Sequence, residues 1–133
     1  MNGTASEDIL WRHLRDLPYF RAMVRAVEDR FYQGMELPSP VLDLGCGDGH
    51  FASVAFDHPL DVGLDPWWGP LLEARTRSAY RMLVRSDGAK IPFPDGYFAS
   101  VVSNSVLEHI PHLEEVLVVM EVGRFNKLMM VVM

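Results

Sequence analysis

The stretch VLDLGCGDG, residues 41–49, decides the fold. An apolar segment runs into the acidic residue Asp43 and then into a loop with glycine at every second position. The segment is apolar on both faces, which is typical of a buried parallel strand. Because glycine has no Cβ, the loop can turn sharply and let a ligand lie against its backbone. A tight turn from strand to helix without any ligand is the simpler alternative.

The pattern around the glycines favours a cationic ligand over a dinucleotide. A dinucleotide fingerprint reads G-x-G-x-x-G and places a pyrophosphate at the start of the following helix. Here the sixth position of that motif is His50. The carboxylate of Asp43, expected at the end of the strand, would repel a diphosphate and attract a cation. A nucleoside with a positive group is therefore expected, and S-adenosylmethionine meets that description.

Composition limits the class of protein. The 133 residues predict one domain, with N-terminal helices in residues 1–36 and a core in residues 37–133. A net charge of -6 disfavours a nucleic-acid surface. The single cysteine, Cys46, excludes an intrachain disulfide and a four-cysteine metal site. The polar N-terminus and the lack of an apolar run of about 20 residues predict a cytoplasmic protein without a membrane span.

Hydrophobic periodicity predicts alternating helices and strands. The helices are expected over residues 6–17, 19–32, 48–56, 69–79 and 111–123, and the strands over 41–43, 60–64, 81–84, 98–103 and 128–133. The first two helices have two interpretations. They form a lid over the cofactor and acceptor, or they simply pack against the sheet.

Asp65 follows the second strand and stands 20 residues after Gly45. At this spacing an acidic residue accepts hydrogen bonds from ribose hydroxyls in nucleotide-binding units. The alternative is a helix cap or solvated turn, since Pro66 comes next, but the glycine loop upstream favours the ribose. Trp67 and Trp68 either cover the adenosine or serve as ordinary core or surface aromatics.

Two stretches together carry a resemblance to a known family. VLDLGCGDGHF, residues 41–51, resembles motif I of the class I S-adenosylmethionine-dependent methyltransferases. GAKIPFPDGYFASVVSNSVLEHI, residues 88–110, resembles the small-molecule branch that includes the ubiquinone and menaquinone biosynthesis methyltransferases. The resemblance covers roughly residues 37–123. It implies a three-layer α/β sandwich with a Rossmann-like, mostly parallel sheet of order 3-2-1-4-5, and methyl transfer to a small-molecule acceptor.

The resemblance also implies roles for particular residues. Asp87 would accept a hydrogen bond from the adenine amino group, with the Ala89 backbone along the ring edge. Asn104 would face the methionine end of the cofactor, and His109 could take a proton from the acceptor, although it could equally cap and pack the loop. The expected cofactor contacts are Asp43, Gly45, Cys46, Gly47, Gly49, Asp65, Pro66, Asp87, Gly88, Ala89 and Asn104. No metal site is expected, because His109 and His112 lack a third ligand.

The chain departs from the family in places. Ala99 replaces a usual aspartate, and the proline- and glycine-rich turn expected before residues 128–133 is absent. The family normally adds a helix and two strands after this point, so the sheet is expected to be truncated relative to the family. Two interpretations stay open: the chain is a fragment, or it forms a homodimer through its last edge strand. Three rival functions stay open: a cofactor-binding module without catalysis, a subunit that needs a partner, and a nicotinamide-dependent oxidoreductase.

Overall fold

The computed structural model describes residues 9–16, 18–32, 35–104, 114 and 127–131. Its strands form one five-stranded sheet of order β3-β2-β1-β4-β5 in which every neighbouring pair is parallel. The strands are β1 (Val41–Leu44), β2 (Leu60–Asp65), β3 (Tyr80–Arg85), β4 (Ser100–Asn104) and β5 (Lys127–Val131). The predicted α/β class and the predicted order 3-2-1-4-5 are confirmed.

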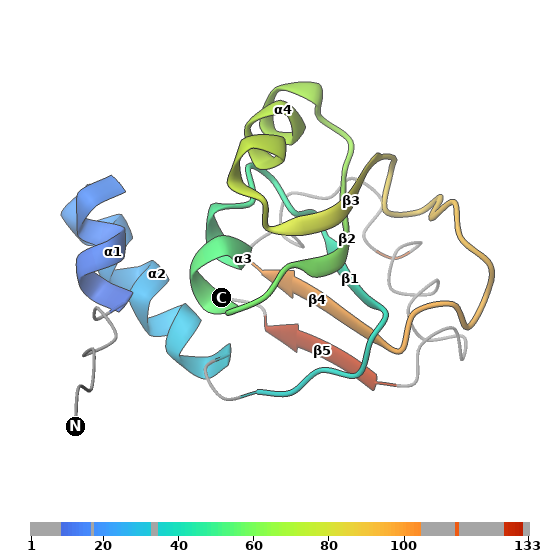
Figure 1. The fold of residues 1–133 in the computed structure, drawn as a ribbon, viewed down its shortest axis with the longest axis horizontal. Helices are drawn as coiled ribbons and strands as arrows, with labels where there is room; N and C mark the ends of the chain where they lie inside the picture. Colours follow the sequence, from blue (N-terminus) through green and yellow to red (C-terminus); the bar gives the residue numbers. More distant parts are fainter. Residues whose placement is uncertain (1–8, 17, 33–34, 105–113, 115–126, 132–133) are drawn as a thin grey trace.

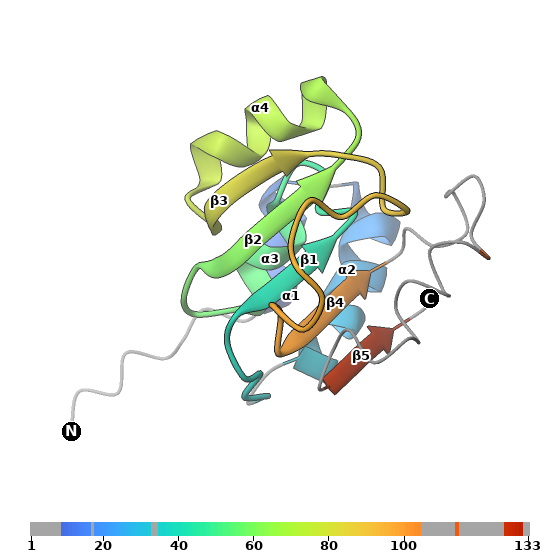
Figure 2. The ribbon, with the colours of Figure 1, turned by 90° about the vertical axis from the view of Figure 1, so that its right-hand side faces the viewer.

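The described helices and one long loop cover opposite faces of the sheet. The helices are α1 (Ile9–Asp16), α2 (Tyr19–Tyr32), α3 (His50–Ala55) and α4 (Trp68–Arg77). Figure 1 shows α1, α2 and α3 on one side of the sheet, and the gold and orange loop of residues 86–99 on the other. In Figure 2 the same loop crosses in front of the strands, with α1, α2 and α3 behind them. None of the described helices has the length and apolar character needed to cross a bilayer.

Alternation along β1 and β4 divides the core into two clusters, because successive side chains point to opposite faces. On the helix face, Val41 and Val102 join α2 and α3. On the loop face, Leu42 and Val101 join the loop. The helix-face cluster consists of Tyr32, Val41, Ala52, Ala55, Phe56, Leu60, Ala79 and Val102. The loop-face cluster consists of Leu42, Leu44, Val62, Leu64, Phe98 and Val101, with Val84, Ala89, Ile91 and Phe93 packed against it.

Several predicted boundaries are wrong by one or two residues. Helix α3 begins at His50 and not at residue 48, because Gly49 has a left-handed backbone with φ of 76°. Strand β4 begins at Ser100 and not at residue 98, since the Ala99 amide donates to the Pro40 carbonyl instead of joining the strand (2.9 Å). Strand β3 starts one residue earlier than predicted, at Tyr80. The helix predicted over residues 111–123 lies outside the described residues, apart from Glu114.

The two N-terminal helices pack against α3. Arg12 of α1 donates to the backbone carbonyls of Ser53 (3.1 Å) and Val54 (3.4 Å) at the C-terminal end of α3. His13 of α1 is buried, and its ring centroid lies 5.1 Å from that of His50. Tyr32 of α2 joins Val41 and Val102 in the helix-face cluster, so α2 packs against the sheet as predicted, while α1 packs on α2 and α3. The action of the two helices as a lid stays a prediction.

Candidate functional site

The carboxyl ends of β2, β1 and β4 bring three predicted site residues to one level of the sheet. Leu44 pairs with Leu64, and Asp43 pairs with Val102. One step beyond the first pair lie Gly45 after β1 and Asp65 of β2, and two steps beyond the second pair lies Asn104 of β4. These three residues therefore lie together at the carboxyl ends of the strands. Ligands of open parallel sheets bind at this edge, near the point where the strand order reverses.

The glycine loop has the backbone that its sequence predicts. The φ angles of Gly45, Gly47 and Gly49 are 73°, 55° and 76°, values that other L-residues rarely adopt. The Gly45 amide donates to the Leu64 carbonyl at 2.8 Å, which ties the loop to the end of β2. The loop thus keeps bare backbone at the carboxyl end of β1, where a ligand can approach closely.

Asp65 joins two loops through its carboxylate. Its Oδ2 accepts from the Gly47 amide at 3.0 Å, and its Oδ1 accepts from the Trp67 amide at 2.9 Å. The side chain is only 6% exposed. Asp65 is thus neither the N-cap of α4, which is Trp67, nor part of a solvated turn, since it is the buried last residue of β2. Each carboxylate oxygen keeps a further lone pair for a second donor. Its contact with a ribose stays a prediction.

Asp43 lies inside β1 and not at the strand end, where the sequence placed it. The strand continues to Leu44, and the Asp43 side chain is 2% exposed. The Tyr80 hydroxyl donates to Asp43 Oδ2 at 2.5 Å. Burial raises the pKa of the Asp43 carboxyl from its ordinary value of 3.8 to about 7; the hydrogen bond from Tyr80 lowers it, and the charge of Asp65 raises it further. Asp43 is thus a buried acid that titrates near neutral pH.

Burial and nearby acids keep the neighbours of Asp43 neutral. Burial raises the pKa of the Cys46 thiol, and the charges of Asp43 and Asp65 add to that rise. Burial and the Asp43 charge also raise the pKa of the Tyr80 phenol. Tyr80 therefore remains a hydrogen-bond donor, and Cys46 is not a thiolate nucleophile.

The turn after β3 lies beside Asp65. The Ser86 amide donates to the Asp65 backbone carbonyl at 3.2 Å. Asp87 is exposed, and its Oδ1 accepts from the Ala89 amide at 2.9 Å. The turn alternative for Asp87 is therefore confirmed, and its predicted contact with adenine is not tested. Gly88, between these two residues, belongs to the same turn.

The two tryptophans after Asp65 have different surroundings. Trp67 is 69% exposed and directly follows the predicted contact Pro66. Trp68 lies under the Arg85 guanidinium, whose carbon is 5.3 Å from the ring centroid. Arg85 Nε also donates to the Pro66 carbonyl at 3.1 Å. The end of β3 thus fixes the course of the loop that follows Asp65.

The remaining predicted residues fall at the end of β4 and beyond it. Asn104 is the last residue of β4 and is 7% exposed. Next to it, the Ser103 hydroxyl donates to the Leu44 carbonyl at 3.0 Å, which links β4 to the start of the glycine loop. His109, the predicted base, lies outside the described residues.

Sequence reasoning missed Tyr80, the partner of Asp43. It begins β3, and Asp43 precedes it by 37 positions. One sequence signal could have indicated the contact. Gly63 interrupts the otherwise apolar core of β2, and a glycine within a strand often marks the close approach of another group.

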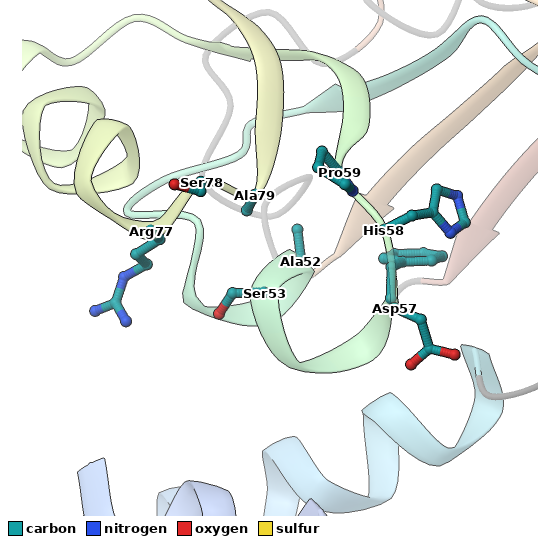
Figure 3. A pocket seen from close by; sticks show the side chains of 9 residues that line it. Ala52, Ser53, Asp57, His58, Pro59, Arg77, Ser78 and Ala79 are labelled. Carbon is teal, nitrogen blue, oxygen red and sulfur yellow. The ribbon is translucent and has the colours of Figure 1, made fainter.

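A cavity of about 140 Å³ lies at the opposite ends of the strands from the predicted site. Its lining comes from the end of α3, the turn at residues 57–59 and the end of α4 with residues 77–79 (Figure 3). Pro59 and Ala79 directly precede β2 and β3, so the cavity is at the amino ends of those strands. It is therefore separate from the carboxyl-end site.

Comparison with known proteins agrees with this geometry. Residues 42–121 match the methyltransferase domain family. An uncharacterized methyltransferase of Mycolicibacterium gilvum is 41% identical over 73 residues, covering 53% of this chain and 29% of that protein. The malonyl-[acyl-carrier protein] O-methyltransferase of Legionella pneumophila is 28% identical over 106 residues, covering 72% of this chain and 37% of that protein. The match thus spans about a third of each relative's length.

Among solved structures, an S-adenosylmethionine-dependent methyltransferase of Thermotoga maritima has the same fold. The TM-score is 0.66 at 18% sequence identity, over 92% of this chain and 59% of that one. At this identity the likeness concerns the fold alone.

Proposed function

Because the chain belongs to the methyltransferase domain family that its residues 42–121 match, we propose that it binds S-adenosylmethionine at the carboxyl ends of β1 and β2. We further propose that it transfers the methyl group to a small-molecule acceptor. One observation carries this proposal. A loop of three left-handed glycines lies against the buried carboxylates of Asp43 and Asp65. Family membership does not favour the nicotinamide-dependent oxidoreductase that the sequence alone left open.

The chemistry of these side chains fits a cationic adenosine compound. When bound, S-adenosylmethionine supplies a methyl group on a positively charged sulfur. The Asp65 charge raises the pKa of Asp43, so the two acids repel each other, and a cation placed nearby would relieve that repulsion. A diphosphate, being negatively charged, would increase that repulsion. The protein's contribution is then to orient two partners, which can supply much of the rate acceleration without a nucleophile or a metal.

Each predicted contact has a place in this proposal. Asp65 would accept from the ribose hydroxyls through its remaining lone pairs, with Pro66 beside it. Asp87 would accept from the adenine amino group, and Asn104 would face the methionine end. The sequence led us to expect that Asp43 holds the amino-acid end of the cofactor, directly or through water. Because Asp43 is buried, we assign it an electrostatic role beneath the loop instead. The backbone positions would be Gly45, Cys46, Gly47, Gly49, Gly88 and Ala89, and His109 would serve as the base for an acceptor that must lose a proton.

The proposed acceptor is a small molecule or a small group on a carrier. The Legionella relative is named for methyl transfer to a malonyl group on acyl-carrier protein, which supports an acceptor of this size. The matched chain spans about a third of that relative. An assay against a panel of small acids and phenols, each with labelled S-adenosylmethionine, would identify the acceptor. Cofactor binding without turnover on any of them would favour the module without catalysis.

Calorimetry tests the cofactor directly. We expect the protein to bind S-adenosylmethionine and S-adenosylhomocysteine, and to bind NAD far more weakly. A preference for NAD, or no heat from either adenosylated compound on folded protein, would contradict the proposal.

Asp65→Ala tests the site. We expect it to weaken S-adenosylmethionine binding by about 1.5–3 kcal/mol, as the loss of a charged hydrogen-bond partner does. Asp61→Ala is the matched control, because the Asp61 carboxylate also accepts from a backbone amide, that of Val41 (2.7 Å). Asp61 lies near the amino end of β2, away from the site. Equal affinity losses in both variants would mean that Asp65 acts only by holding the fold.

A further inference from the structure

The Tyr80 side chain crosses a whole strand to reach Asp43. Tyr80 belongs to β3 and Asp43 to β1, and β2 lies between them. The phenol hydroxyl donates to Asp43 Oδ2 at 2.5 Å. An interaction between two non-adjacent strands requires the intervening strand to leave room for the ring.

Two glycines provide that room. A Cβ added to Gly63 of β2 would lie 2.9 Å from two ring carbons of Tyr80, closer than real Cβ atoms come. A Cβ added to Gly49 would lie 3.1 Å from the same ring and 3.3 Å from the Ala74 Cβ. The Tyr80 ring thus packs against Gly49, the last glycine of the loop, while its hydroxyl donates a hydrogen bond to Asp43. Tyr80 therefore links the loop to the buried acid.

The charged and titratable groups around Asp43 come from several elements. Tyr80 approaches from β3 and Asp65 from β2, and Cys46 and Asp48 belong to the loop. His50 starts α3, and Arg77 of α4 forms an ion pair with Asp48 at 3.8 Å. Among the influences on the Asp43 carboxyl, the hydrogen bond from Tyr80 lowers the pKa, whereas burial and Asp65 raise it. The Tyr80 hydroxyl thus keeps part of the Asp43 population ionised near neutral pH.

We propose that Tyr80 is a positioning residue of the cofactor site, which holds the Asp43 carboxylate beneath the glycine loop in its charged form and so sets the affinity for the cationic cofactor. This inference rests on the proposed function. It adds a residue that no motif marks and that acts through Asp43, without contact to the cofactor.

Tyr80→Phe is the test, because it removes the hydroxyl and keeps the ring against Gly49 and Gly63. We expect S-adenosylmethionine to bind severalfold more weakly near pH 7, because loss of the Tyr80 hydrogen bond raises the pKa of Asp43 and lowers its ionised fraction. The loss should shrink as the pH rises, because Asp43 then ionises in both proteins. Tyr97→Phe, which alters an exposed tyrosine packed on Phe93 and Phe98, is the matched control and should bind like the wild type.

A titration without the cofactor separates this inference from the proposed function. The ¹³C carboxyl signal of Asp43, followed across pH, should titrate at a higher pH in Tyr80→Phe than in the wild type or in Tyr97→Phe. Equal midpoints would overturn the inference even if the wild type binds the cofactor. A shifted midpoint with unchanged S-adenosylmethionine affinity would overturn the positioning role alone. If the wild type binds no cofactor, the proposed function fails and the affinity claim fails with it, whatever the carboxyl titration shows.

Discussion

Gly63 lies within an ordinary stretch of β2, yet a side chain there would collide with Tyr80. This constraint differs from the one on Gly45, Gly47 and Gly49, whose φ angles are positive. At Gly63 the limit is space, because an added Cβ would lie 2.9 Å from the Tyr80 ring and 3.0 Å from Leu83. At the residue scale, the site thus depends on a glycine outside the glycine motif.

Gly63→Ala should lower the free energy of unfolding by about 1–3 kcal/mol, the usual cost of overpacking. It should also weaken S-adenosylmethionine binding, because the displaced ring would carry the Tyr80 hydroxyl away from Asp43. Chemical denaturation and calorimetry measure the two effects. Gly69→Ala is the control, since Gly69 lies in α4 and an added Cβ meets open space. A helical glycine replaced by alanine should leave stability unchanged or raise it by about 0.5–1 kcal/mol. Equal stability of both variants would contradict the crowding at Gly63.

At the scale of the elements, the sequence predicted the order of the sheet and the starts of β1 and β2, but not the start of β4. Apolar runs and the glycine loop identify the elements, and Asp65 was found by its spacing from Gly45. The start of β4 depends on a contact that no local pattern contains, the bond from Ala99 to Pro40. The Asp43–Tyr80 pair was missed for the same reason, because it joins strands that are not adjacent.

The docking of α1 on α3 depends on Arg12, which donates to two carbonyls at the C-terminal end of α3. Such carbonyls lack partners within the helix, and a cation there is favourable. Arg12→Met should therefore cost about 1.5–3 kcal/mol, the range for hydrogen bonds from a charged group. Urea denaturation measures the cost, and hydrogen exchange should show faster opening of α1. Arg75→Met, on the exposed surface of α4, should change neither measurement. If both variants behave alike, Arg12 does not anchor α1.

At the scale of the whole molecule, the described sheet ends at β5, which pairs with β4 on one side. Its sequence, KLMMV, is mostly apolar. An edge strand presents unpaired N–H and C=O groups on which another chain can add a strand. We expect dimers through this edge, so light scattering should give a mass that rises above 15.1 kDa with concentration. A mass that stays at 15.1 kDa over the whole concentration range would contradict the predicted dimer.

The buried Asp43 carboxyl makes the stability of the whole fold depend on pH. Its pKa is about 7 in the folded protein, against an ordinary value of 3.8. Between these values the folded state holds a proton that the unfolded chain has lost, so the free energy of unfolding falls as pH rises from about 4 to about 7. The difference amounts to a cost on the order of 4 kcal/mol above that window.

Asp43→Asn should remove this cost, because an amide carries no charge and its oxygen can still accept from Tyr80. We expect the variant to be more stable than the wild type near pH 8 by a few kcal/mol, and much closer to it near pH 5. Urea denaturation at several pH values measures the free energy of unfolding of both proteins. Their difference at each pH isolates Asp43, because the titration of all other groups is common to both. Asp57→Asn, at an exposed carboxylate after α3, is the matched control for the loss of one negative charge. A constant difference between Asp43→Asn and the wild type across this window would show that Asp43 is already ionised at low pH in the folded protein.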